Sequence, residues 1–193
     1  MIGNRIGHRL DPSISYVLRK LHGSRGSPNL FTVLGFFATL LASVLILREL
    51  WFSAGLAIIL SGLFDLFDGV VARELGKVTA FGGFLDSVLD RYSDLILLMA
   101  LAIHYMKRGE LTLVIIAFLA SIGTALIPYA RARAETAGIP CTIGLMERAE
   151  RIILLSVGAL SHCMGLILWV LAVLTHFTVL QRIWYVWKTL RSR

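Results

Sequence analysis

Apolar residues dominate six segments of the chain from residue 28 onward, and short polar stretches separate these segments. All but one are close to the ~20 residues that a helix needs to cross a bilayer. The fifth segment in order is short, unless its helix begins near Met146, and a polar loop over residues 130–151 precedes it. The pattern predicts an all-α integral membrane protein with six transmembrane helices. These helices are expected at residues 30–47, 52–71, 81–105, 111–129, 152–160 and 164–185.

The first 27 residues are polar and basic and follow a different pattern. Between residues 11 and 21, four apolar side chains recur at helical spacing on one face. This spacing predicts a short amphipathic juxtamembrane helix that lies along the membrane surface. We therefore expect an N-terminal cytoplasmic segment, residues 1–27, followed by one six-helix domain, residues 28–193.

Composition supports a membrane protein and gives its orientation. The chain is 57% hydrophobic and 16% charged, whereas soluble domains carry about 25% charged residues. Its net charge is +7, but no soluble stretch is long enough to form a nucleic-acid reading module, so we expect no nucleic-acid partner. Basic residues gather before the first segment, after the second, fourth and sixth, and only Arg48, Lys107 and Arg108 lie at the opposite ends. The positive-inside rule then predicts a multi-pass protein of the cell (inner) membrane, with both termini in the cytoplasm.

Five of the six aspartates of the chain lie between residues 65 and 94, among apolar residues. Asp65 and Asp68 are three residues apart, and Asp86 and Asp90 are four apart. On helices each pair shares a face. The two pairs fall on consecutive antiparallel helices joined by a short turn, so we expect the four carboxylates to meet at one depth near the cytoplasmic side.

Four carboxylates repel one another and are costly to bury in a membrane. Hard divalent cations, which prefer oxygen ligands, are the partners that best fit this cluster. Two metals held by carboxylates suit phosphoryl transfer, because they neutralise charge on the attacking and leaving oxygens. We therefore expect two Mg²⁺ ions, with Mn²⁺ as an alternative. Asp94 lies three residues after Arg91. It could form a structural ion pair with that arginine or belong to the metal site, and the sequence leaves both roles open.

A transporter of divalent cations or protons is the alternative from another functional class, since carboxylates in membrane spans also occur there. A transporter would require polar groups near the midplane and a path to the far side. The acidic cluster is one-sided, and the later segments offer little other polar lining. This favours an enzyme.

The fixed positions Asp65-x2-Asp68-Gly69-x2-Ala72-Arg73-x8-Gly82-x3-Asp86-x3-Asp90 resemble the signature of the CDP-alcohol phosphotransferase family, and all eight match. The resemblance implies a six-helix membrane enzyme, usually a homodimer, that joins a CDP-linked lipid to an alcohol and releases CMP. The donor would be CDP-diacylglycerol or a CDP-ether lipid.

The resemblance also implies roles for residues. Asp65, Asp68 and Asp86 would bind the metals. Asp90 would contact the second metal and act as the general base on the acceptor hydroxyl. The residues expected to bind the CDP-linked lipid are Pro28, Asn29, Thr32, Gly69, Arg73, Thr79 and Gly82.

The identity of the acceptor alcohol is indicated by arginines that lie on the same side of the membrane as the aspartates. Arg131, Arg133, Arg148 and Arg151 suggest an acceptor that carries a phosphate, although loop arginines can also contact lipid headgroups. The segment over residues 129–152 is similar to the corresponding segment in one branch of the family. That branch makes phosphatidylinositol phosphate, or its archaeal ether-lipid equivalent, from inositol phosphate. Arg131 stands where that branch often has Lys, and Arg182 is expected to complete the pocket. Glycerol phosphate is the alternative acceptor.

Overall fold

The computed structural model describes residues 28–74 and 76–192, and these residues form α-helices and connections, with no β-strand among them. The all-α prediction is therefore confirmed for this part of the chain. The amphipathic helix expected between residues 11 and 21 and the boundary at residue 27 lie outside the described residues. The helices are α2 (Pro28–Leu47), α3 (Trp51–Glu74), α4 (Ala80–Lys107), α5 (Leu111–Thr136), α6 (Arg148–Leu160) and α7 (Met164–Arg191).

The main difference from the predicted boundaries is in α5. The polar loop was expected from residue 130, but α5 passes through Pro128 and ends at Thr136. The residues after Pro128 are rich in Ala, Arg and Glu, which favour helix. The carbonyl oxygen of Ile127 accepts a hydrogen bond from the guanidinium of Arg182, which supports the backbone next to the proline. As a result Arg131 lies on a helix rather than in a loop.

Four described helices, α2, α3, α5 and α7, are long and apolar enough to cross a membrane. The remaining two differ from them for separate reasons. α4 has 28 residues, but its first half carries aspartates and an arginine. α6 has 13 residues, so it is only roughly 20 Å long at ~1.5 Å per residue. The length and apolar composition of these four helices indicate an integral membrane protein.

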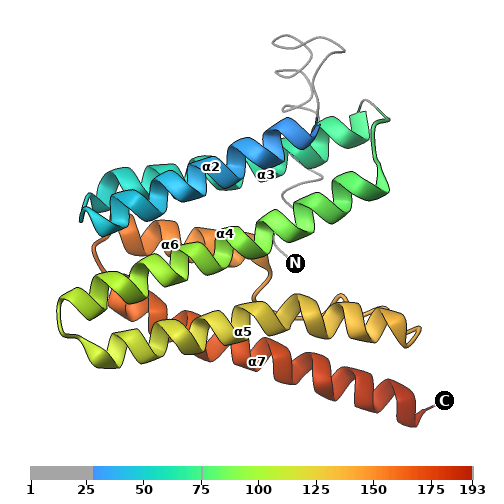
Figure 1. Ribbon diagram of the computed structural model, residues 1–193. Helices are drawn as coiled ribbons and strands as arrows, with labels where there is room; N and C mark the ends of the chain where they lie inside the picture. The colour runs from blue at the N-terminus through green and yellow to red at the C-terminus, as the bar shows by residue number, and fades with distance from the viewer. Residues whose placement is uncertain (1–27, 75, 193) are drawn as a thin grey trace.

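The helices form two groups with α6 between them (Figure 1). α2 packs on α3 and α4, α4 packs on α5, and α5 packs on α7, while α6 packs on α3 and α7. The turns after α2, α4 and α6 lie at one end of the molecule. The α3–α4 turn, the α5–α6 connection and the described chain ends lie at the other (Figure 1). We call the end with the turns after α2, α4 and α6 the turn end. We call the other the aspartate end, because the aspartates lie in the second half of α3 and the first half of α4.

Small residues allow the helices to approach closely, as is common in membrane proteins. Ala42, Ala117 and Ala159 are fully buried. A Cβ atom added to Gly55 of α3 would lie 2.8 Å from Leu160 of α6, and one added to Gly123 of α5 would lie 2.2 Å from the Thr175 hydroxyl of α7. These glycines therefore fix the close packing of α3 on α6 and of α5 on α7.

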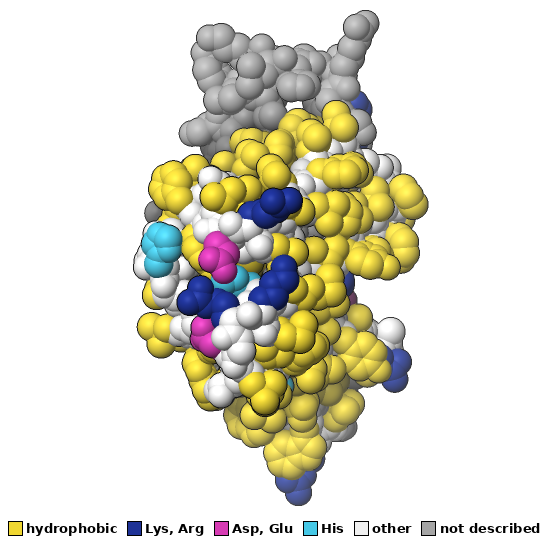
Figure 2. All heavy atoms as spheres, turned by 60° about the vertical axis from the view of Figure 1, so that its left-hand side comes forward, with side chains coloured by type: hydrophobic (Ala, Val, Ile, Leu, Met, Phe, Trp, Pro, Cys, Tyr) yellow, Lys and Arg dark blue, Asp and Glu magenta, His cyan; other side chains and the backbone are white. Residues whose placement is uncertain are grey.

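The turn end carries a small polar patch bordered by hydrophobic side chains (Figure 2). Nδ1 of the buried His104 lies 3.6 Å from a Glu49 carboxylate oxygen. Nε of Arg108 lies 3.2 Å from a Glu110 carboxylate oxygen. The ring of Trp51 meets the His104 ring edge-on, with 4.8 Å between centroids. Glu49 contacts both His104 and Arg108, so the patch ties the α2–α3 turn to the end of α4. These turns lie together at the turn end (Figure 1).

Candidate active site

The aspartate cluster forms where the second half of α3 faces the first half of α4. One carboxylate oxygen from each of Asp65, Asp68 and Asp86 lies within 4.8 Å of the other two. The spacing along each helix accounts for this, since residues three or four apart share a face. Three of the four residues predicted to bind metal are thus brought together from two helices.

Asp90 joins the cluster through an arginine of α6. Nη1 of Arg148 lies 2.5 Å from Oδ1 of Asp90 and donates a hydrogen bond to Oδ1 of Asp65. One guanidinium from α6 therefore contacts carboxylates of both α3 and α4. Nε of Arg148 is buried and has no hydrogen-bond partner within residues 28–74 and 76–192.

The donor set fits a divalent metal ion. Asp68 is 7% exposed, and its Oδ2 accepts a 2.8 Å hydrogen bond from the Thr32 hydroxyl of α2. Oδ1 of Asp86 is buried, and in the part of the chain that the structure describes it has no hydrogen-bond partner. A buried polar atom without a partner is costly. Converging carboxylate oxygens with a spare acceptor are the ligands that Mg²⁺ and Mn²⁺ prefer.

A cavity of about 210 Å³ adjoins the cluster, and Asp68 and Asp86 line it. Every residue predicted to bind the CDP-linked lipid also lines this cavity: Pro28, Asn29, Thr32, Gly69, Arg73, Thr79 and Gly82. The sequence prediction missed Lys77, another lining residue, although its place in the α3–α4 turn two residues before Thr79 could have indicated it. The structure therefore gathers α2, α3 and the start of α4 around one cavity.

Local backbone structure keeps this cavity open. The Thr79 hydroxyl caps α4 by accepting a 3.0 Å hydrogen bond from the Gly82 N–H. A Cβ atom at Gly82 would lie 3.0 Å from the Thr79 Oγ1 and 3.1 Å from Oδ1 of Asn29. Glycine at this position thus leaves room that an alanine methyl group would occupy.

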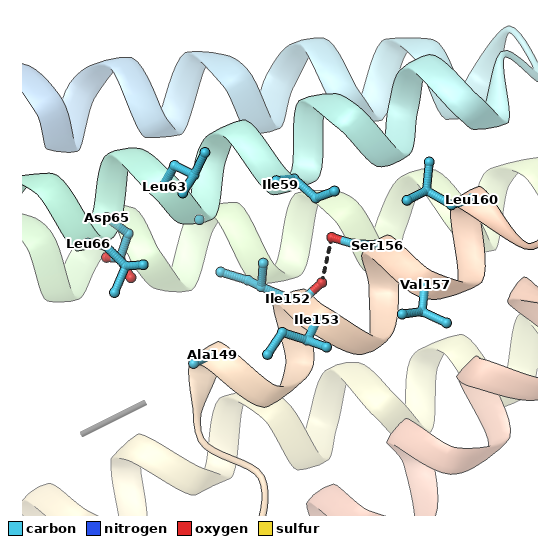
Figure 3. A pocket seen from close by; sticks show the side chains of 11 residues that line it. Ile59, Leu63, Asp65, Leu66, Ala149, Ile152, Ile153, Ser156, Val157 and Leu160 are labelled. Carbon is cyan, nitrogen blue, oxygen red and sulfur yellow. Dashed lines mark hydrogen bonds between the residues drawn. The ribbon is translucent and has the colours of Figure 1, made fainter. Parts of the chain in front are cut away.

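A second hollow, an apolar groove of about 340 Å³, lies between α3 and α6 (Figure 3). Among the described residues that line it, Asp65 is the one that is ionisable. The hydroxyl of Ser156 donates a 2.8 Å hydrogen bond to the Ile152 carbonyl oxygen (Figure 3), so this polar group is satisfied within α6. The apolar lining residues are Ile59, Leu63, Leu66, Ala149, Ile152, Ile153, Val157 and Leu160. The sequence did not predict this groove.

The five arginines predicted to bind the acceptor phosphate fall into three groups by their exposure. Arg131 and Arg133 are exposed on the last turns of α5, and Nε of Arg131 donates a 2.8 Å hydrogen bond to Glu135. The side chain of Arg148 is 15% exposed and contacts the aspartates. Arg151 and Arg182 are each 2% exposed, so the prediction that they contact an acceptor phosphate stays a prediction.

Both buried arginines have protein partners. Nη2 of Arg151 lies 2.5 Å from Oδ2 of Asp94, and its Nη1 donates to the Met146 carbonyl oxygen at 3.2 Å. Nε of Arg182 donates to the Ile143 carbonyl oxygen at 2.9 Å. Asp94, for which the sequence left two roles open, thus forms a buried ion pair with an arginine far along the chain.

Comparison with known proteins agrees with the resemblance seen in the sequence. The family model described as CDP-alcohol phosphatidyltransferase matches residues 25–186. An archaetidylinositol phosphate synthase of Pyrococcus horikoshii is 35% identical over 187 residues, which cover 94% of this chain and 97% of the relative. A phosphatidylinositol phosphate synthase of Mycobacteroides abscessus is 34% identical over 165 residues, which cover 81% of this chain and 75% of the relative.

The fold is similar to solved structures of the phosphatidylinositol phosphate synthase of Mycobacterium tuberculosis. The structure with CDP-DAG bound superposes with a TM-score of 0.78 at 30% identity, covering 95% of this chain and 94% of that one. The complex with manganese and citrate has a TM-score of 0.80 at 30% identity, covering 90% and 88%. With a family match over residues 25–186, the chain belongs to the CDP-alcohol phosphatidyltransferase family, and it is an integral membrane transferase of phospholipid biosynthesis.

Proposed function

We propose that the protein transfers a phosphatidyl group, or its ether-lipid equivalent, from a CDP-linked lipid to inositol phosphate and releases CMP. The observation that carries this proposal is the place of Arg148, whose guanidinium lies against Asp65 and Asp90. Its buried Nε has no partner among the described residues, so a charge-assisted hydrogen bond to an acceptor phosphate is left to it. The relatives named as archaetidylinositol phosphate synthase and phosphatidylinositol phosphate synthase support the same acceptor.

Metal binding is assigned to the aspartate cluster. Asp65, Asp68 and Asp86 would hold one divalent ion, and Asp90 would contact a second. When bound, such ions neutralise negative charge on phosphoryl oxygens and so stabilise the transition state of phosphoryl transfer. We expect Mg²⁺ in this role and Mn²⁺ as a substitute.

The donor lipid is assigned to the two hollows that adjoin the aspartates. The CDP group would lie in the cavity lined by Asn29, Gly69 and Thr79, where Arg73 can pair with a phosphate. One hydrocarbon chain would lie in the apolar groove between α3 and α6, which reaches Asp65. The Ser156 hydroxyl in this lining is already bonded within α6, so a hydrocarbon chain buried beside it would leave it satisfied.

The reaction needs one proton acceptor. The acceptor hydroxyl oxygen forms a bond to the lipid-side phosphorus of the CDP group, and the bond from that phosphorus to the bridging oxygen breaks. CMP leaves with the bonding electrons, and the Asp90 carboxylate takes the hydroxyl proton. Such general-base catalysis contributes typically 10²–10⁴-fold. Arg148 contacts Asp90 and would hold the acceptor phosphate beside it.

We also propose the topology and assembly. α4 and α6 would cross or enter the membrane with the four longer helices, which gives six spans. The aspartate end, with Arg73, Lys77 and the exposed Arg131 and Arg133, would face the cytoplasm, as the positive-inside rule predicts. The family resemblance further suggests a homodimer.

The first experiment measures CMP release by the purified protein with CDP-diacylglycerol and Mg²⁺. Inositol phosphate, glycerol phosphate, free inositol and serine are supplied in turn, and Asp90→Asn is the control. Release with inositol phosphate that Asp90→Asn abolishes is the expected result. Release only with glycerol phosphate would overturn the headgroup assignment. Membership of a transferase family argues against the alternative, raised from the sequence, that the protein is a transporter.

A further inference from the structure

Two arginine–aspartate contacts join α6 to α4, one helical turn apart. Arg148 contacts Asp90, and Arg151 contacts Asp94. The arginines are three residues apart on α6 and the aspartates four apart on α4, so each helix presents both partners on one face. The first contact lies in the aspartate cluster. The second lies outside it, and the reaction proposed above does not use it.

The second contact is the more deeply buried. Arg151 is 2% exposed and Asp94 is 4% exposed, and their charged atoms are 2.5 Å apart. Removing one partner from a buried ion pair leaves an uncompensated charge, which is strongly destabilising. The position of Arg151 relative to α4 is therefore narrowly determined.

Arg151 also fixes the start of its own helix. Its Nη1 donates a 3.2 Å hydrogen bond to the carbonyl oxygen of Met146, which precedes the first residue of α6. One side chain thus holds α4, through Asp94, and the connection that leads into α6. Arg148 lies between these two attachments, so its direction depends on them.

We propose that Asp94 and Arg151 are positioning residues, which orient the first turn of α6 so that the Arg148 guanidinium faces Asp65 and Asp90. This inference rests on the proposed function in one respect, because Arg148 is taken to bind the acceptor phosphate. Breaking the pair turns Arg148 away from the acceptor without altering the cavity that Thr32, Thr79 and Gly82 line. The KM of the phosphorylated acceptor then rises, while the KM of the CDP-linked lipid changes little.

A double-mutant cycle tests whether the pair acts through Arg148. CMP release is measured for the unmodified protein, Asp94→Asn, Arg148→Ala and the double variant, with each substrate varied. We expect Asp94→Asn to raise the acceptor KM on the order of tenfold or more, since misplacement by about 1 Å can cost up to ~10². In the Arg148→Ala background, Asp94→Asn should alter the acceptor KM by less than about twofold. Equal effects in both backgrounds would show that the pair only stabilises the fold and would overturn the proposal.

Two further variants keep the test independent of folding. Asp94→Asn combined with Arg151→Gln removes both buried charges, and it replaces Asp94→Asn in the cycle if that variant does not fold. Glu110→Gln breaks the exposed pair with Arg108 at the turn end, and it should leave both KM values unchanged. A rise in the lipid KM as large as that in the acceptor KM would contradict positioning through Arg148.

The cycle also separates this inference from the proposed function. If the unmodified protein uses glycerol phosphate, the headgroup assignment fails, and the cycle is run with that acceptor to the same expected result. If it uses inositol phosphate and the cycle is additive, only the positioning role fails. Release with an unphosphorylated alcohol alone would overturn both.

Discussion

The hydrogen bond from Thr32 to Asp68 gives a quantitative test of the metal site. Thr32→Val keeps the shape of the side chain and removes the hydroxyl that donates to Oδ2 of Asp68 at 2.8 Å. Both residues are buried, and the Thr32 hydroxyl is the group that donates to this Asp68 oxygen. Loss of a hydrogen-bond partner that orients a metal-binding carboxylate typically costs ~10–100-fold in metal affinity. We expect the Kd for Mn²⁺ to rise about ten- to hundredfold, because Asp68 loses the group that orients its carboxylate.

The chain offers a matched control on the same two helices. The Thr39 hydroxyl of α2 lies 2.7 Å from the Ser61 hydroxyl of α3, and Thr39 is 1% exposed. Thr39→Val therefore removes a buried bond between α2 and α3 that does not involve an aspartate. Both variants should lose stability by about 1 kcal/mol, whereas only Thr32→Val should weaken Mn²⁺ binding. Mn²⁺ binding is measured by electron paramagnetic resonance on the detergent-purified protein. An unchanged Kd in Thr32→Val, or an equal rise in Thr39→Val, would show that Asp68 does not need this donor to bind metal.

Three other predictions address the hollows and the arginine. Gly82→Ala should raise the KM of the CDP-linked lipid, because the added methyl group would lie 3.1 Å from Asn29; Gly83→Ala, whose Cβ meets nothing within 4 Å, should have a smaller effect in the same CMP-release assay. Ile153→Trp should fill the groove between α3 and α6 and slow turnover of long-chain CDP-diacylglycerol more than that of a short-chain analogue; equal slowing would place the lipid chain elsewhere. Arg148→Ala should lower the Kd for Mn²⁺, since it removes a cation that contacts two of the carboxylates, and a weaker Mn²⁺ affinity would contradict that competition.

Much of the fold and of the aspartate cluster could be predicted from the sequence, because both depend on local periodicity. The lengths of the apolar segments predicted the helices, and the three- and four-residue spacings placed Asp65 with Asp68 and Asp86 with Asp90. The family resemblance led to the residues that line the cavity at the start of α2 and α4. Pro28 and Gly82 lie far apart in sequence, yet they line the same cavity.

The features that the sequence did not predict depend on tertiary contacts. The continuation of α5 past Pro128 is supported by Arg182, which lies on α7. Asp94 has a local candidate partner, Arg91, at 3.5 Å, and helical spacing alone cannot show that Arg151 of α6 approaches to 2.5 Å. The groove between α3 and α6 likewise exists only where the two helix surfaces pack imperfectly, and no pattern within one helix encodes such a gap.

The groove between α3 and α6 has a kinetic consequence. It is lined almost entirely by hydrocarbon and reaches Asp65, so a substrate tail held there need not pass through water on its way to the carboxylates. Donor and product would then enter and leave by lateral diffusion within the leaflet. Turnover should follow the mole fraction of CDP-linked lipid in a mixed micelle or vesicle, and diluting that lipid with inert phospholipid should slow the enzyme even when its total concentration in the tube is constant.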